Sequence, residues 1–167
     1  MDEIDKIIDA IILAEVGNKP NGGYTNDPHD AGGRTQWGIA ERSNPEAWLD
    51  NKVTEEEARA IYRKRYVDGP GFSGITDRHL QHFLVDWGVI SGPAIAIQHL
   101  QRTLGVQADG TLGAVTLAAA NNADPRALVN RLVIARVKMI GQIIHRRPSQ
   151  VQWINGWLNR ALEFFVV

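Results

Sequence analysis

Hydrophobic residues near the N-terminus recur at helical spacing. They occupy positions Ile4, Ile7, Ile8, Ile11 and Ile12. Residues three or four apart share one face of a helix, so this run predicts an amphipathic helix. The helix is expected to end near Gly17, because Pro20 prevents its continuation.

The segment 17–34 is rich in Gly, Asn, Asp and Pro, which predicts turns and loop. Thr35 to Ala40 is expected to form one short strand that pairs with residues near Tyr24 in a small hairpin. This hairpin is the only β element that the pattern predicts.

The remaining apolar runs predict further helices. Thr54 to Glu57 reads as a capping box, and Gly69-Pro70-Gly71 ends the helix that it opens. Later helices are expected at Leu80–Trp87, Ile97–Leu104, after Asp109-Gly110, from Asp124 to about His145, and at Ile154–Phe165. The fold class is therefore α+β and mostly α-helical.

Composition fits an ordinary globular protein, with 44% hydrophobic and 22% charged residues in 167. There is no cysteine, so neither a disulfide nor a thiolate-bound metal is expected. The segment from Met1 to Asp9 is acidic and lacks the basic start of a signal peptide. We therefore expect synthesis in the cytoplasm and release by another factor.

The net charge is −1, but the C-terminal quarter is cationic. Its basic residues are Arg126, Arg131, Arg136, Lys138, Arg146, Arg147 and Arg160, against the single acid Glu163. These charges are either solvated helix faces or a surface for an anionic envelope polymer. No nucleic-acid motif accompanies them, so nucleic acid is not an expected partner.

Glu15 is the first candidate catalytic residue. It follows Ile11 by four positions, which places it on the apolar face of the first helix, in its last turn. Partial burial and the negative end of the helix dipole would both favour the protonated form that a glycosidic general acid requires. The alternative is an ordinary surface carboxylate at a helix end.

The loop after Glu15 supplies further acids. Asp27 and Asp30 lie in it, and Thr35 follows. Glycoside hydrolysis uses two carboxyl groups on opposite sides of the scissile bond. The alternative is a loop whose acids only satisfy backbone amides. Calcium-loop spacing is incomplete, and the histidines lack zinc-ligand spacing, so no metal is expected.

The order of these residues forms a recognisable string. It reads Glu15, Gly22-Gly23-Tyr24, Asn26-Asp27-Pro28, Asp30, Gly32-Gly33, Thr35 and Gly38-Ile39. It resembles glycoside hydrolase family 108, the phage-type N-acetylmuramidases. The segment after Gly92 resembles the family's peptidoglycan-binding companion, through Leu100–Arg102, Ala108–Gly110 and Gly156–Arg160. Two departures stand out: Val16 to Asn21 are inserted after Glu15, and Ile90 replaces an expected Asn.

The resemblance implies catalytic roles for three residues. Glu15 would be the proton donor, while Asp30 and Thr35 would complete the set, with Thr35 positioning the attacking water. The residues that flank the cleft and would contact substrate are Tyr24, Asp27, Gln36 and Trp37; the aromatic ones could instead belong to the core. Arg34 would either meet a peptide-stem carboxylate or stay solvated.

The resemblance further implies a lysozyme-like fold, with a catalytic lobe at residues 1–92 and a helical peptidoglycan-binding-like lobe at 93–167. The implied protein is a monomeric phage endolysin without cofactor. It would cleave the β-1,4 bond between N-acetylmuramic acid and N-acetylglucosamine. It would be released from the host cytoplasm to the cell wall through a holin. The alternatives are a lytic transglycosylase and a non-catalytic wall-binding phage protein.

Overall fold

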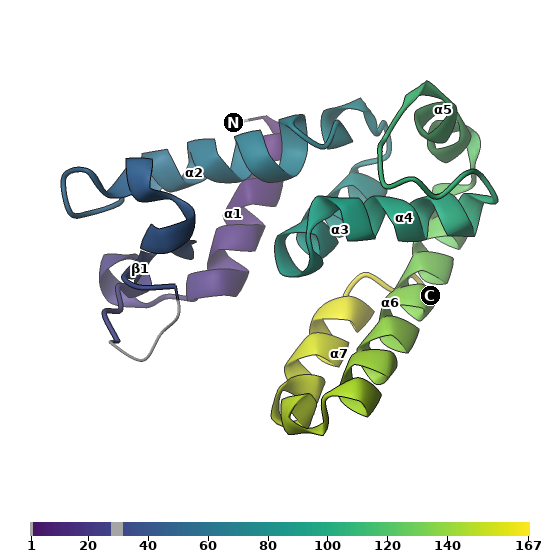
Figure 1. The fold of residues 1–167 in the computed structure, drawn as a ribbon. Helices are drawn as coiled ribbons and strands as arrows, with labels where there is room; N and C mark the ends of the chain where they lie inside the picture. The colour runs from purple at the N-terminus through teal and green to yellow at the C-terminus, as the bar shows by residue number, and fades with distance from the viewer. Residues whose placement is uncertain (1, 28–31) are drawn as a thin grey trace. The chain divides into compact units, whose positions relative to one another are not determined.

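The structure is a computed structural model that describes residues 2–27 and 32–167. The chain divides into two compact units, Met1–Gly69 and Pro70–Val167. Figure 1 shows their elements, with a small β hairpin in the first unit and helices in the second. The expected mostly helical α+β fold is confirmed.

Helix α1, Glu3–Val16, opens the first unit. Asp2 caps it reciprocally with Asp5, and the chain leaves the helix at Gly17, as expected. Its buried face consists of Ile7, Ile8, Ile11, Ile12 and Val16. This face packs on α2, Glu55–Arg63, which begins at the predicted capping box and continues as a π-helical turn, Lys64–Asp68.

The hairpin is formed by β1, Thr35–Gln36, and β2, Ile39–Ala40, paired antiparallel. The expectation of one strand over this segment is wrong, because the chain reverses at Trp37 and Gly38. Both residues have positive φ, 53° and 75°, as a tight two-residue hairpin turn requires. The expected contact with the Tyr24 region is confirmed by a bridge between Thr25 and Thr35.

Short 3₁₀ turns complete the first unit: η1 Pro20–Gly23, η2 Glu41–Ser43 and η3 Pro45–Trp48. Trp48 and Val53 are buried and extend the apolar core beneath the hairpin region. The loop between β2 and α2 is thereby tied to the core rather than left in solvent.

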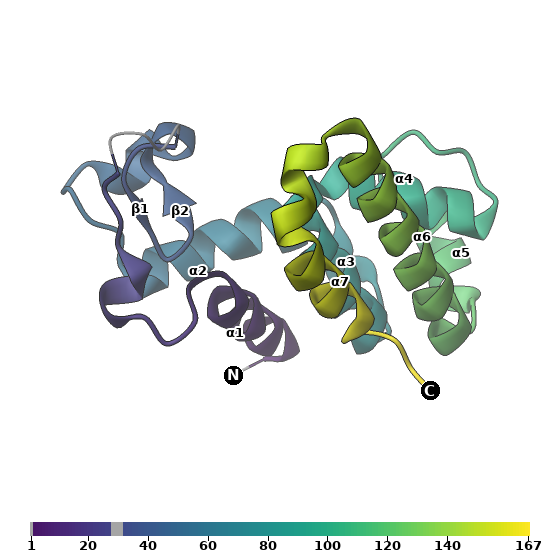
Figure 2. The ribbon, with the colours of Figure 1, turned by 90° about the horizontal axis from the view of Figure 1, so that it is seen from below.

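The second unit is helical. Its elements are η5 Phe72–Gly74, α3 Arg78–Ser91, α4 Pro93–Leu104, α5 Ala114–Asn122, α6 Pro125–Arg146, η6 Pro148–Trp153 and α7 Ile154–Leu162. Helix α6 packs against α3, α4 and α7, and Figure 2 shows α6 and α7 side by side. The largest fully buried side chains of this unit include Phe72, Phe83, Leu84, Trp87, Leu100 and Leu132.

Helix α6 carries apolar residues at helical spacing, which predicts one buried face. Leu128 and Leu132 on this face are buried, whereas Met139 and Ile143 are only half-buried. The expectation that Arg136 faces solvent is wrong, because its side chain is 2% exposed and forms an ion pair with Asp86. From the sequence alone, an arginine in an amphipathic helix is assigned to the polar face, because the acid that would pair with it in the core is not evident.

No helix in residues 2–27 and 32–167 has the length and hydropathy needed to cross a membrane. Among the same residues, no group of three or more His, Asp or Glu side chains is placed to hold a metal ion.

Candidate active site

Glu15 lies in the last turn of α1, two residues before the capping Gly17. Its side chain is exposed, so the expectation of partial burial is wrong. The helix buries Ile12 and Val16 on either side of it, and Glu15 falls at the edge of that buried face. A substrate can therefore reach the carboxyl group directly.

The turn of the hairpin lies against Glu15. A Cβ placed at Gly38 would lie 3.5 Å from the Glu15 Cβ and would collide with the Tyr62 hydroxyl. Tyr62, on α2, donates from this hydroxyl to the Trp37 carbonyl at 3.2 Å. The end of α1, the hairpin turn and α2 thus converge beside Glu15, and only glycine fits at position 38.

Trp37 rests on the Gly-Gly-Tyr motif. A Cβ at Gly22 would collide with the Trp37 ring, and the Trp37 N–H donates to the Gly22 carbonyl at 2.7 Å. The indole is half-buried, which leaves part of its surface accessible beside the turn that contacts Glu15. The sequence did not indicate the contact between Trp37 and Gly22 or the hydrogen bond from Tyr62. The only sequence signal for the contact was the double glycine before Tyr24.

Gln36 is 5% exposed, and its amide group is bonded within the fold. Its Nε2 donates to the backbone and side-chain oxygens of Asn21, at 3.2 and 3.0 Å. Its Oε1 accepts from the Val53 N–H at 2.9 Å. Gln36 therefore joins three segments of the unit, and this role leaves its amide no exposed face for a sugar.

The structure describes Thr35 and Asp27 but not Asp30. Thr35 is half-buried in β1, and its backbone exchanges two hydrogen bonds with Thr25, at 2.9 and 3.0 Å. Asp30 lies outside the described residues, so its roles stay predictions. Asp27 is exposed, in the loop just before the part that is not described.

An open groove of about 640 Å³ lies beside this loop. It is lined by Asn26, Asp27, Gly33, Arg34, Glu41, Arg42 and Pro45. This volume falls within the range of small-molecule sites, roughly 300–1,000 Å³. Within the described part of the chain, its lining includes Asp27 but neither Glu15 nor Thr35.

A fixed ion pair forms one edge of the groove. Arg34 donates to both carboxylate oxygens of Glu41, at 2.8 and 2.6 Å, and to the Asn51 side chain at 3.1 Å. Its guanidinium lies 4.9 Å from the centre of the Trp48 ring. The hydrogen bond from Arg34 lowers the pKa of Glu41, and the Glu41 carboxylate raises the pKa of Arg34. The ion pair thus favours the ionised form of Glu41, and it engages the partly exposed Arg34 guanidinium within the fold.

Tyr24 is 41% exposed, and its ring centre lies 6.3 Å from that of Trp48. One part of the ring therefore packs on the core while another part faces solvent. This position is compatible with the predicted sugar contact, since an aromatic face can pack against the C–H groups of a sugar.

Comparison with known proteins finds a family match for each of two segments of the chain. Residues 16–92 match the family model for glycosyl hydrolase 108, and residues 95–162 match that of a predicted peptidoglycan domain. The solved structure of SagA from Brucella abortus is similar, with a TM-score of 0.68 and 29% identity over 96% of this chain and 94% of that one. A search of curated proteins finds no significant match.

The two family matches meet between residues 92 and 95, whereas the compact units divide after Gly69. Segment 70–92 therefore belongs to the hydrolase match by sequence and packs with the helices of the second unit. The predicted lobe boundary at residue 92 stays a prediction. By the order of its matched segments, the chain carries a lysozyme-like glycoside hydrolase family 108 domain of the N-acetylmuramidase-type peptidoglycan hydrolases at residues 16–92, followed by a peptidoglycan-binding domain at residues 95–162.

Proposed function

We propose that the protein hydrolyses the β-1,4 bond between N-acetylmuramic acid and N-acetylglucosamine, with Glu15 as the proton donor. The observation that carries this proposal is the position of Glu15. Its exposed carboxyl lies where the end of α1 meets the hairpin turn, with its Cβ against Gly38. Trp37, in the same turn, packs on Gly22 of the Gly-Gly-Tyr motif that follows Glu15 in the sequence.

The chemistry requires one transferable proton and one water. The Glu15 carboxylic acid protonates the glycosidic oxygen as the bond from this oxygen to the muramic acid C1 breaks. The electron pair of that bond goes to the departing N-acetylglucosamine hydroxyl. Because Glu15 is exposed in the free protein, the bound glycan itself must exclude water around it.

The positive charge that develops on the sugar ring needs a second group. We assign this to Asp30, whose carboxylate would stabilise the charge or take a proton from the attacking water that Thr35 positions. Asp27, in the groove, is the competing acid. If Asp27→Asn lowers the rate far more than Asp30→Asn, Asp27 is the second carboxylate and Asp30 is not.

Glu15→Gln tests the acid directly. Glutamine has the shape of glutamate but no transferable proton, so the rate of clearing of purified cell walls should fall about 10²-fold or more. Glu3→Gln, at the exposed start of the same helix, is the matched control and should leave the rate unchanged. A Glu15→Gln rate above about a tenth of the wild-type rate would rule out this role.

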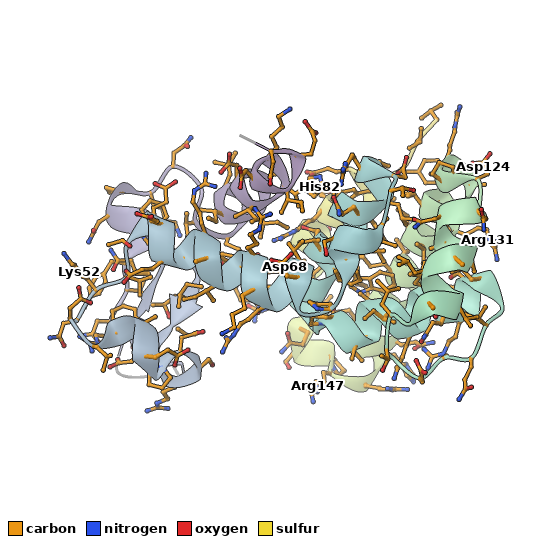
Figure 3. All side chains as sticks on the ribbon, turned by 90° about the horizontal axis from the view of Figure 1, so that it is seen from above. Lys52, Asp68, His82, Asp124, Arg131 and Arg147 are labelled. Atoms are coloured by element: carbon orange, nitrogen blue, oxygen red, sulfur yellow. The ribbon has the colours of Figure 1, made fainter. Side chains whose placement is uncertain are left out.

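We further propose that the protein is a monomeric phage endolysin that reaches the wall from the host cytoplasm through a holin. The basic turn after α6 would meet anionic groups of the envelope. Arg146 and Arg147 are exposed there, beside Val151 and Trp153, which are 55% and 56% exposed (Figure 3 labels Arg147). Cells that express the protein alone should stay intact and lyse when their inner membrane is permeabilised; lysis without permeabilisation would contradict this route.

A further inference from the structure

The hairpin turn carries a tryptophan where the backbone favours a small residue. Trp37 has a φ of 53°, in the left-handed region, and Gly38 follows with a φ of 75°. Two-residue turns of this kind favour Asn-Gly, Asp-Gly or Gly-Gly, and a bulky side chain at positive φ is strained. Such strain persists only where surrounding contacts hold it, and it is concentrated at functional sites. The turn alone therefore does not explain why residue 37 is a tryptophan.

Two hydrogen bonds hold the Trp37 backbone in this conformation. Its N–H donates to the Gly22 carbonyl at 2.7 Å, and its carbonyl accepts from the Tyr62 hydroxyl at 3.2 Å. Tyr62 is 4% exposed on α2, so the core fixes the position of this hydroxyl. The turn that it holds is the one that lies against the acid, since a Cβ at Gly38 would be 3.5 Å from the Glu15 Cβ.

The segment Val16–Asn21, which is inserted relative to the family's motif, leads to the backbone that supports the indole. Asn21 and Gly22 follow one another at positive φ, 53° and 60°. The Gln36 Nε2 donates to the backbone and side-chain oxygens of Asn21, at 3.2 and 3.0 Å. The end of the insertion is therefore fixed by the residue that precedes Trp37 in the hairpin.

One face of the indole is covered and the rest of the ring is partly accessible. A Cβ at Gly22 would collide with Cδ2 and Cε2 of Trp37. These two atoms are shared by both rings and cannot be approached in the plane of the indole, so Gly22 lies over one face. The side chain is nevertheless only half-buried, whereas the core residues Trp48 and Trp87 are 3% and 0% exposed. The exposed part of Trp37 therefore belongs to the opposite face and the edges.

We propose that this opposite face of Trp37 is the platform on which a sugar ring of the glycan packs beside Glu15, and that Tyr62 is the positioning residue that holds it. The C–H face of a sugar packs well on an aromatic ring, and a ring fixed before binding loses little entropy. The insertion then serves to support the platform. This inference rests on the proposed function in one respect, since the sugar belongs to the strand that Glu15 cuts.

The test uses the full chain carrying Glu15→Gln, labelled with fluorotryptophan, and a soluble tetrasaccharide of alternating N-acetylglucosamine and N-acetylmuramic acid. The chain has five tryptophans, and in the fluorine NMR spectrum Trp37→Asn identifies the line of Trp37. This line should shift as the tetrasaccharide is added, while the line of the buried Trp87 should not. Trp37→Asn should weaken binding about tenfold. Asparagine tolerates a positive φ and keeps both backbone hydrogen bonds, so the thermal midpoint should change little.

Tyr62→Phe tests the positioning role, because it removes the hydroxyl and keeps the ring. It should move the Trp37 line in the free protein and weaken binding of the tetrasaccharide severalfold. Combined with Trp37→Asn it should weaken binding no further, since the platform that the hydroxyl holds is then absent. Tyr66→Phe is the matched control, because the Tyr66 ring centre lies 5.8 Å from that of Tyr62, and it should leave both measurements unchanged.

Two results would overturn the proposal. One is a Trp37 line that the tetrasaccharide does not move. The other is a loss of affinity on Tyr62→Phe that is equally large with and without the Trp37 indole, which would mean that Tyr62 acts only through the fold. Both measurements report binding and not cleavage, so retained wall clearing by Glu15→Gln would refute the catalytic proposal alone.

Discussion

The Asp86 carboxylate joins three helices of the second unit. It lies on α3 and is 3% exposed. It accepts from the Arg136 Nη1 on α6 and from the Arg160 Nε on α7, both at 2.7 Å. Replacing it by asparagine keeps the size and one acceptor oxygen but removes the negative charge between two guanidinium groups.

The cost of Asp86→Asn follows from the burial of Arg136. This side chain is 2% exposed, and burial lowers its pKa while the Asp86 carboxylate acts to raise it. A buried ion that loses its partner typically destabilises a protein by about 3–5 kcal/mol. At about 2–4 °C per kcal/mol for a chain of this size, the thermal midpoint should fall by roughly 6–20 °C.

The assay is thermal and urea unfolding followed by circular dichroism. Asp68→Asn is the control, because Asp68 pairs with Arg63 at 3.6 Å in an exposed position (Figure 3 labels Asp68), and it should change the free energy of unfolding by less than about 1 kcal/mol. If Asp86→Asn changed stability no more than Asp68→Asn, Arg136 would not depend on this carboxylate, and the reasoning would be refuted.

Three further results are expected. Gly38→Ala forces a methyl group toward the Tyr62 hydroxyl at a positive φ, so it should slow wall clearing and lower the thermal midpoint, and adding Tyr62→Phe should recover part of both. Burial lowers the pKa of His82 in the folded protein, whereas in the unfolded chain a histidine has a pKa of about 6.5. Between these two pKa values the unfolded chain binds more protons, so the free energy of unfolding should decline as the pH falls from about 6.5 through the folded pKa. This decline should be smaller in His82→Gln. Salt screens the attraction of Arg146 and Arg147 to an anionic envelope, over about 8 Å at physiological ionic strength. Added salt should therefore lower the rate of wall clearing less when both residues are replaced by Gln. An unaltered dependence on salt would mean that these charges only solvate the surface.

Much of the fold followed from local patterns. Helix α1 and the capping box at Thr54 were predictable because apolar spacing and end signals are carried by neighbouring residues. The hairpin turn was not, because Trp37 adopts a positive φ that its type disfavours and that a contact with Gly22 supports. The burial of Arg136 was not predictable either, because its partner Asp86 lies 50 residues away in the sequence.

The candidate site divides in a similar way. Glu15 is a candidate because it lies at the end of a helix before a motif, and its catalytic role stays a prediction. Its exposure depends on how the hairpin packs against α1, which residue spacing does not reveal. Gln36 was expected at the substrate because it flanks the motif, whereas its amide joins Asn21 and Val53. Long-range hydrogen bonds of this kind decide whether a polar residue serves the fold or the ligand.

The central claim is hydrolysis of the muramic acid glycosidic bond, and mass spectrometry of the fragments released from purified peptidoglycan tests it most directly. The account predicts fragments that end in a reducing N-acetylmuramic acid, with that new end labelled when the digest is run in heavy-oxygen water. Fragments one water lighter, with a 1,6-anhydro end, would identify a lytic transglycosylase. Wall binding without any released fragment would contradict catalysis altogether.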